Sequence, residues 1–256
     1  MLKFTANLSM LFKEVELIDR FKMAKEAGFN AVEIQFPYSL SPEQIQQALN
    51  EHSLKLVLFN VDADDLLQGG EGLAAVPEKQ AQFKRAVEQT VAYAEILKPK
   101  VINVLAGRCF DDSKTALYLE TFKENLRYAL KAFSPLGIKT VFEAINTIDM
   151  PQFIVNNSEQ MRAIQQEINH PDLLMQYDIY HMYKMGEDCA TIIQQYVDKI
   201  GHIQFADAPN RGQPSTGEID FKSLFLSIEQ SNYQGWIGAE YNPTGTTLES
   251  LAWLSY

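Results

Sequence analysis

The sequence predicts a (β/α)8 barrel, a closed ring of eight parallel strands in which a helix follows each strand. Short apolar, β-branched runs alternate with longer amphipathic segments along the chain, which is the pattern of repeated βα units. The length of 256 residues suits one such barrel. Apolar residues make up 46% of the chain and charged residues 21%, which provides enough apolar material for one core. We therefore expect residues 1–256 to form a single domain.

Eight runs have the length and composition of buried parallel strands. They are residues 4–8, 31–36, 54–60, 101–105, 140–145, 173–178, 202–206 and 236–241. A segment that can form a helix follows each run, although the last one, after residue 247, is short. The same units could build an open doubly wound sheet, but that fold usually carries a glycine-rich phosphate-binding turn after its first strand. Residues 7–10 contain no glycine, which favours the closed barrel.

Local signals mark several boundaries between these elements. Ser41, Pro42 and Gln44 form the pattern of an N-cap, a proline at the first helical position and a capping-box glutamine, so a helix should begin there. Gly28 suits the left-handed position that ends a helix, just before the second strand. Residues 61–77 include three glycines and show little periodicity. We expect this segment to be a long βα loop that could cover a site on the barrel.

The charge of the chain limits its partners. The formal net charge is −11, whereas nucleic-acid binding depends on clusters of Lys and Arg that neutralise phosphates. We therefore expect no nucleic-acid partner. A small anionic substrate could still bind, but it would need a local cation or a bound metal ion to overcome the overall negative field.

The sequence shows no signal for secretion or for membrane insertion. The N-terminal stretch lacks the apolar region of a signal peptide, and no run approaches the ~18 apolar residues of a membrane span. Cys109 and Cys189 have no metal-site or redox spacing and should be free thiols. We predict a cytoplasmic protein that does not bind membranes. A homo-oligomer is compatible with the sequence, which does not fix the oligomeric state.

Each of the last four predicted strands supplies one polar residue in its C-terminal part: Glu143, Asp178, Gln204 and Glu240. The active sites of such barrels lie at the C-terminal ends of the strands, so we expect these side chains to meet. Three neighbouring buried carboxylates would repel one another, and a divalent cation at their centre would remove that repulsion. Oxygen ligands of this kind favour Mg²⁺ or Mn²⁺. Each acid could instead be capped separately, but recurrence on four successive strands favours a metal site.

Five further residues could contact a substrate. His181 lies where the chain should leave the sixth strand for a loop, and it could hydrogen-bond a substrate oxygen or serve a structural role. Arg211 and Arg108, on the loops after the seventh and fourth strands, could each pair with a carboxylate or be solvated. Asn7 and Asn60 end the first and third strands, where they could line the cavity or bind backbone groups.

Two more polar residues are expected inside the barrel. Glu33 lies within the second predicted strand. His202 precedes Gln204 by two residues, so the alternation of a strand places both side chains on one face. We expect His202 to lie deeper and to support Gln204.

Several motifs together resemble the hydroxypyruvate isomerase family, within the wider group of xylose isomerase-like TIM barrels. They are Asn-Leu-Ser-Met-Leu-Phe at 7–12, Phe-Pro-Tyr at 36–38, Gln-Tyr-Asp-Ile-Tyr-His-Met at 176–182, Gly-His-Ile-Gln at 201–204, Gly-Glu-Ile at 217–219 and Gly-Trp-Ile-Gly-Ala-Glu-Tyr at 235–241. The resemblance covers essentially the whole chain. At 69–72 the chain reads Gly-Gly-Glu-Gly where family members often carry Gly-Glu-Arg-Gly. If that arginine holds a substrate carboxylate in the family, Arg211 or Arg108 must bind the carboxylate in its place here.

The resemblance implies an isomerase that interconverts hydroxypyruvate and 2-hydroxy-3-oxopropanoate (tartronate semialdehyde) through a metal-stabilised enediolate. It implies that Glu143 and Glu240 are the proton donor and acceptor, and that these two residues bind the metal with Asp178 and Gln204. The substrate would be a small anionic hydroxy-oxo acid.

Other functions remain open on the sequence. A 2-oxo-tetronate isomerase would use the same chemistry on a four-carbon acid, and a ketose 3-epimerase would return the proton to the same carbon. A sugar-acid-binding barrel without catalysis is the non-enzymatic alternative. An abasic-site endonuclease can share the barrel, but it would need several histidine ligands and a basic DNA-binding face. The four histidines and the net charge of −11 argue against it.

Overall fold

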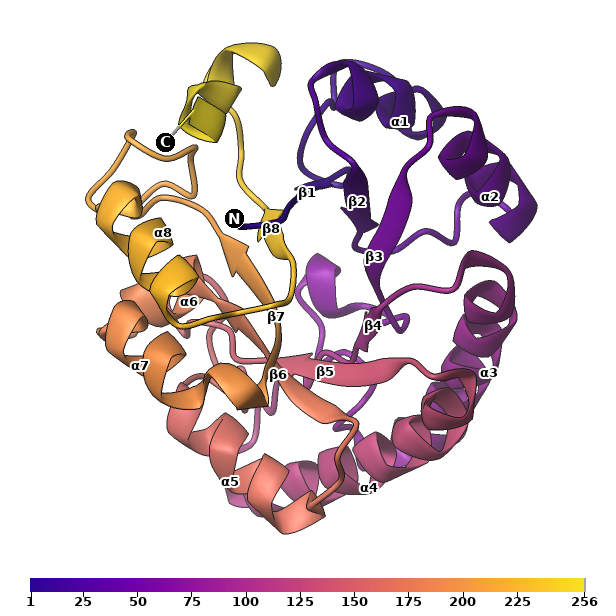
Figure 1. Ribbon diagram of the computed structural model, residues 1–256. Helices are drawn as coiled ribbons and strands as arrows, with labels where there is room; N and C mark the ends of the chain where they lie inside the picture. Colours follow the sequence, from indigo (N-terminus) through magenta and orange to yellow (C-terminus); the bar gives the residue numbers. More distant parts are fainter. Residues whose placement is uncertain (256) are drawn as a thin grey trace.

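Eight parallel strands form a closed barrel in the computed structural model, which describes residues 1–255 (Figure 1). The strands follow one another in chain order around the ring, and β1 pairs with β8 to close it. Their bounds are β1 Phe4–Asn7, β2 Ala31–Ile34, β3 Lys55–Asn60, β4 Val101–Asn103, β5 Lys139–Glu143, β6 Leu173–Asp178, β7 Ile200–Phe205 and β8 Ile237–Ala239. All eight predicted strands are confirmed, with ends that differ by at most two residues.

Helices surround the strands on the outside of the barrel (Figure 1). They are α1 Leu17–Glu26, α2 Pro42–Glu51, α3 Gln80–Leu97, α4 Thr115–Phe133, α5 Ser158–Ile168, α6 Ile179–Lys184, α7 Cys189–Tyr196 and α8 Phe221–Gln230. Two helices, α6 and α7, follow β6, and the segment after β8 is a 3-10 helix, Leu248–Ser255. Within residues 1–255, no helix has the length and apolar character needed to cross a membrane.

The C-terminal 3-10 helix packs against the first and seventh strands through Trp253. Trp253 is buried, and its ring contacts the rings of Phe4 and Phe205 at centroid distances of 5.1 Å and 4.9 Å. These edge-on aromatic contacts join β1, β7 and the end of the chain. The end of the chain therefore packs against strands that are far from it in the sequence.

The predicted helix boundaries are confirmed at both positions where a specific geometry was expected. Gly28 has a φ of 96°, in the left-handed region. The Ser41 hydroxyl accepts from the Gln44 amide at 3.3 Å, and the Gln44 side chain accepts from the Ser41 amide at 2.9 Å. This reciprocal capping box begins α2 at Pro42.

Replacing Ser41 with alanine should lower the free energy of unfolding by about 1 kcal/mol, because one amide at the start of α2 loses its acceptor. Urea unfolding followed by circular dichroism measures this change. Ser39→Ala, at a neighbouring exposed serine, is the matched control and should change stability by less than about 0.5 kcal/mol. Equal losses in both variants would show that the capping box contributes nothing specific.

The long loop after β3 folds onto the face of the barrel, as expected. It contains two short 3-10 helices, Leu66–Gln68 and Pro77–Lys79. Gly107, in the loop after β4, has a φ of 95°, and a Cβ there would lie 2.3 Å from the carbonyl oxygen of Glu71. The two loops therefore touch through their backbones, and Leu66 and Leu67 of the first loop line the cavity at the strand ends. Both cysteines are free thiols, as predicted, and both are buried.

Candidate active site

The four strand-end residues lie buried at the C-terminal end of the barrel. Glu143 and Asp178 are the last residues of β5 and β6, Gln204 is on β7, and Glu240 directly follows β8. Their exposed fractions are 5%, 1%, 1% and 4%. Burial and the nearby charges of Asp178 and Glu240 hold the pKa of Glu143 well above its usual value. The structure therefore brings the predicted acids together, in a place where their mutual repulsion is strong.

Asp178 and His181 are placed by the start of helix α6. One carboxylate oxygen of Asp178 accepts from the backbone amides of Tyr180 at 2.8 Å and His181 at 3.3 Å, so Asp178 is the N-cap of α6. The prediction that His181 lies on a loop was wrong, because this cap turns the chain into a helix directly after β6. The other oxygen of Asp178, Oδ2, is buried and has no hydrogen-bond partner.

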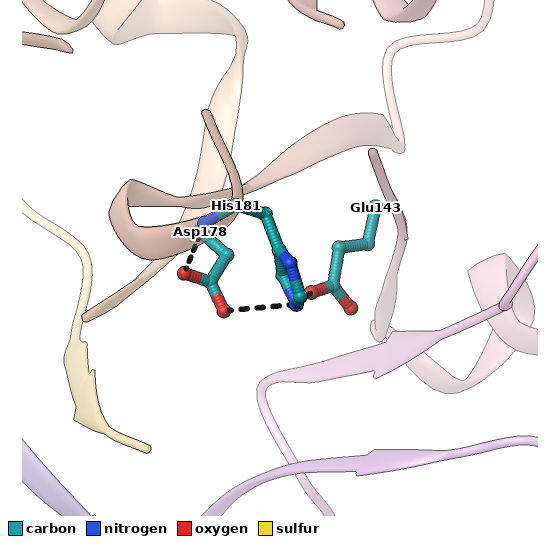
Figure 2. Close-up of side chains that lie close together, drawn as sticks. All are labelled: Glu143, Asp178 and His181. Atoms are coloured by element: carbon teal, nitrogen blue, oxygen red, sulfur yellow. Dashed lines mark hydrogen bonds and ion pairs between the residues drawn. The ribbon is translucent and has the colours of Figure 1, made fainter. Parts of the chain in front are cut away.

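Glu143, Asp178 and His181 are close enough to share one ion (Figure 2). The Nε2 atom of His181 lies 3.9 Å from Glu143 Oε1 and 3.8 Å from Asp178 Oδ2. One potential ligand atom from each residue lies within 4.8 Å of the other two. Unpaired carboxylate oxygens at this spacing suit a hard divalent cation, which would also lower the repulsion between the acids.

Hydrogen bonds around His181 favour the tautomer in which Nε2 carries the proton and can donate a hydrogen bond into the site. Burial lowers the pKa of His181 to about 4, so the ring is neutral near pH 7. The Asn146 side-chain oxygen accepts from the amides of Ile148 and Asp149, which directs its nitrogen toward His181 Nδ1 at 2.6 Å. Nδ1 is then the acceptor, and Nε2 carries the proton and points toward the carboxylates. This arrangement suits contact with a substrate oxygen better than metal ligation.

Glu240 has donors at both of its oxygens. Oε1 accepts from Arg211 at 2.6 Å and from Gln35 at 3.1 Å, while Oε2 accepts from Asn7 at 2.8 Å and from Gln204 at 2.5 Å. Burial, opposed by the charge of Arg211, raises the pKa of Glu240 to about 8. Arg211 is not a solvated loop residue, because its side chain is only 24% exposed.

Gln204 is held between Glu240 and two further residues. Its nitrogen also donates to Glu33 at 2.7 Å, and its oxygen accepts from Gln176 at 2.6 Å. The sequence suggests that the Gln204 oxygen is a metal ligand. In that role it would have to give up its hydrogen bond from Gln176 and bind the ion instead. His202 supports this group indirectly, since its Nε2 lies 2.7 Å from the second oxygen of Glu33.

The strand ends and loops enclose a cavity of about 180 Å³. Five of the predicted site residues line it, and they are Glu143, Glu240, His181, Arg211 and Asn60. Other polar lining residues were not predicted, and they are Gln35, Asp149 and Gln176. The remaining wall is apolar and consists of Phe36, Leu66, Leu67, Leu105, Ile145 and Met150. Within residues 1–255, Arg211 is the only lining residue with a permanent positive charge.

Asn7 and Arg108 lie outside this lining. Asn7 donates to Glu33 and Glu240, so it orients acids and does not face the cavity. Arg108 donates to the carbonyl oxygen of Leu66 at 3.3 Å, which holds the loop after β3. Of the two predicted arginines, the structure brings only Arg211 to the acids.

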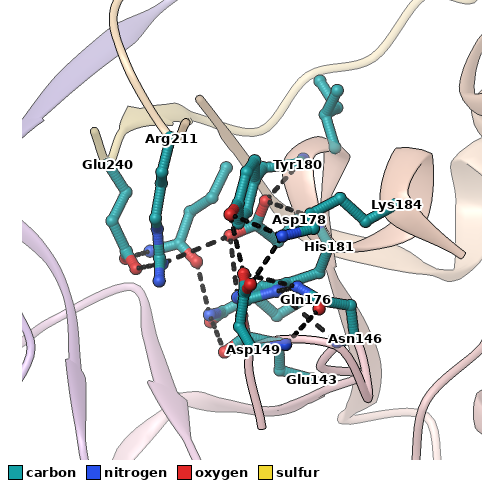
Figure 3. A network of polar contacts seen from close by, with 12 residues as sticks. Glu143, Asn146, Asp149, Gln176, Asp178, Tyr180, His181, Lys184, Arg211 and Glu240 are labelled. Carbon is teal, nitrogen blue, oxygen red and sulfur yellow. Dashed lines mark hydrogen bonds and ion pairs between the residues drawn. The ribbon is translucent and has the colours of Figure 1, made fainter. Parts of the chain in front are cut away.

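A network of polar and aromatic contacts connects Arg211 with Tyr180, Asp149 and Lys184 beside the cavity (Figure 3). The Tyr180 hydroxyl donates to Asp149 at 2.7 Å, and Lys184 donates to the other oxygen of Asp149 at 2.5 Å. Although partial burial opposes it, these hydrogen bonds lower the pKa of Asp149 to about 2. The guanidinium of Arg211 lies over the Tyr180 ring, 5.3 Å from its centroid. Asp149 is therefore charged and has Lys184 as its ion-pair partner, whereas Arg211 is paired with Glu240.

Comparisons with known proteins find relatives over nearly the whole chain. The sequence model described as xylose isomerase-like TIM barrel matches residues 21–256. Hydroxypyruvate isomerase of Escherichia coli (strain K12) is 39% identical over 254 residues, which covers 99% of this chain and 98% of that protein. The 2-oxo-tetronate isomerase of Pectobacterium atrosepticum is 36% identical, and the match covers 98% of this chain and 96% of that protein.

Solved structures extend the comparison to the fold. A Brucella melitensis protein called an AP endonuclease of family 2 superposes with a TM-score of 0.95 at 35% identity, covering 100% of this chain and 98% of that one. An L-ribulose 3-epimerase superposes with a TM-score of 0.77 at 17% identity, covering 100% of this chain and 86% of that one. This likeness shows a shared fold alone.

Proposed function

Because the chain belongs to the xylose isomerase-like TIM barrel family and is an isomerase, we propose that it interconverts hydroxypyruvate and 2-hydroxy-3-oxopropanoate. The observation that supports this substrate most directly is the cavity itself. It measures about 180 Å³, contains two buried glutamates, and offers one guanidinium among its lining residues. A small acid with a single carboxylate suits both the size and the charge of this space.

In the proposed reaction, the substrate carboxylate pairs with Arg211 and the reacting carbons lie between Glu143 and Glu240. One glutamate removes a proton from C3 of hydroxypyruvate, which gives an enediolate, and a proton returns to C2. The hydroxyl proton passes between the two oxygens, and the Nε2 proton of His181 is placed to hydrogen-bond one of them. The buried position of the site excludes bulk water from this intermediate.

Mg²⁺ or Mn²⁺ is the proposed cofactor. The carboxylates of Glu143, Asp178 and Glu240 and the amide of Gln204 would hold it, and the unpaired Oδ2 of Asp178 supports this set. When bound, such an ion supplies positive charge that favours loss of a proton next to a carbonyl.

The main alternative is a 2-oxo-tetronate isomerase, which the relative at 36% identity supports. A ketose 3-epimerase is less favoured. A neutral six-carbon sugar would place hydroxyl groups against apolar residues such as Leu66, Leu67 and Met150, which offer them no side-chain hydrogen bonds.

Proton NMR of hydroxypyruvate in D2O with the purified protein and Mg²⁺ tests the proposal, with EDTA as the control. We expect signals of 2-hydroxy-3-oxopropanoate to appear only when the metal is present. No conversion of hydroxypyruvate, with conversion of a 2-oxo-tetronate under the same conditions, would reject the three-carbon substrate and support the four-carbon alternative.

The two arginines should differ in their effect on substrate binding. Arg211→Gln should raise KM by about 10- to 100-fold, because a charge-assisted pair with the substrate carboxylate is lost. Arg108→Gln should change KM by less than about twofold, since Arg108 holds a loop carbonyl outside the cavity. Initial rates over a range of hydroxypyruvate concentrations measure both values. The reverse ranking would assign the carboxylate to Arg108.

A further inference from the structure

The acidic residues of the site divide into a closed half and an open half. Glu240 is closed, since its two oxygens together accept four hydrogen bonds, from Arg211, Gln35, Asn7 and Gln204. The open half consists of Asp178 Oδ2, which has no partner, and Glu143 Oε1, for which the nearest ion-pair contact is His181 at 3.9 Å. A cation that enters the open half therefore meets a glutamate that is already paired.

One guanidinium spans the two halves. The Nη2 atom of Arg211 lies 2.6 Å from Glu240 Oε1 and 3.9 Å from Asp178 Oδ2. It therefore stands where a cation bound to both carboxylates would have to lie. A guanidinium and a divalent ion repel each other strongly at such distances in a buried site, so the two cannot occupy this place together.

The backbone of Arg211 is fixed, whereas its side chain is held by few contacts. The carbonyl oxygen of Arg211 accepts from the amide of Asn242 at 2.8 Å, and Asp207 and Gly212 pair through their backbones on either side of the loop. The side chain contacts Glu240 and the face of Tyr180, and its Nε is buried without a partner. A rotation about the side-chain bonds can therefore move the guanidinium without remodelling the loop.

We propose that Arg211 is an exchangeable counter-ion of the metal-free site: the divalent metal displaces its guanidinium from Glu240, and the released guanidinium then binds the carboxylate of the substrate. Metal binding thus prepares the anion site, and the metal binds before the monocarboxylate substrate. This inference rests on the proposed function, because it assumes a divalent ion at the acids and an acidic substrate. It adds a positioning role for Arg211 before the substrate arrives.

Isothermal titration of Mn²⁺ into the EDTA-treated, dialysed protein, without substrate, tests the exchange. Arg211→Gln removes the competing cation and should bind Mn²⁺ at least tenfold more tightly than the wild-type protein. Arg162→Gln is the matched control, because Arg162 also lies over a tyrosine ring, that of Tyr196 at 4.1 Å, and belongs to helix α5 outside the cavity. Its Mn²⁺ affinity should stay within twofold of the wild type.

A chemical rescue separates exchange from a general structural effect. Guanidinium ion at low millimolar concentration should weaken Mn²⁺ binding by Arg211→Gln severalfold and leave the wild-type affinity unchanged. Thermal unfolding provides a second readout. Without metal, Arg211→Gln should have a lower melting temperature than the wild type, and Mn²⁺ should raise the melting temperature of the variant more than that of the wild type.

The outcomes also separate this inference from the proposed substrate. Equal or weaker Mn²⁺ binding by Arg211→Gln would overturn the exchange even if hydroxypyruvate is converted. Tighter binding by the variant supports the exchange even if hydroxypyruvate is not a substrate. Absence of Mn²⁺ binding to both proteins would overturn the exchange together with the proposed cofactor.

Discussion

Replacing Glu143 or Glu240 with glutamine should lower kcat by about 10²- to 10⁴-fold, because an amide cannot exchange a proton with carbon. The two residues are buried on strands β5 and just after β8 and face one cavity. Of the two substitutions, Glu143→Gln should disturb the surrounding hydrogen bonds less. Glu143 Oε2 accepts from Asn103 at 3.3 Å and Gln176 at 2.9 Å, and a glutamine oxygen can keep both bonds. Proton NMR of substrate conversion measures the rate.

The fold should survive these substitutions, so circular dichroism and thermal unfolding must accompany the kinetics. Glu88→Gln, at an exposed position of helix α3, is the matched control and should keep the wild-type kcat. If either active-site variant retained near-normal turnover, its role in proton transfer would be refuted. Loss of turnover only in Glu240→Gln would make Glu143 a ligand or a source of charge without a proton-transfer role.

The acids of the site could be predicted from the sequence because the barrel itself collects them. Parallel strands end at one face, so an acid at the end of each of several strands must meet the others. The same reasoning extends to residues that the prediction omitted. Gln176 precedes Asp178 by two residues and Gln35 follows Glu33 by two, so strand alternation places each pair on one face. Both glutamines bond to an active-site acid.

The loop residues could not be predicted in this way. Arg108 and Arg211 have the same chemistry and similar positions after their strands, and only tertiary contacts separate them. Arg108 is drawn to the carbonyl of Leu66, whereas Arg211 reaches Glu240. His181 was assigned to a loop because the six-residue helix α6 is too short to show a helical period. The acid at its N-cap, Asp178, was the available signal.

Substitutions in the deepest part of the site should lower the free energy of unfolding more than substitutions elsewhere in the site. Glu33 is completely buried, and its two oxygens accept from Asn7, Gln204 and His202 at 3.1, 2.7 and 2.7 Å. It also fills space that a larger residue at position 238 would take, since a Cβ on Gly238 would lie 2.4 Å from Glu33 Oε2. One carboxylate thus links β1, β2 and β7 beneath the reacting groups.

Glu33→Leu should therefore lower the free energy of unfolding by about 3–5 kcal/mol, because three buried donors lose their acceptor. Glu33→Gln should cost about 1–3 kcal/mol. The glutamine oxygen can still accept from Asn7 and Gln204, and a change of the His202 tautomer would let its Nε2 accept from the new amide nitrogen. Urea unfolding measures the difference between the two variants.

The matched control for these variants is Glu26→Gln, at the exposed end of helix α1, which should change stability by less than about 0.5 kcal/mol. A leucine variant as stable as the wild type would mean that the donors find other partners, and that Glu33 does not organise this layer. Because Glu33 fixes the Gln204 nitrogen, and so directs the Gln204 oxygen toward Gln176, we also expect Glu33→Leu, which removes this acceptor, to weaken Mn²⁺ binding. A loss of stability without that change in metal affinity would confine Glu33 to a structural role.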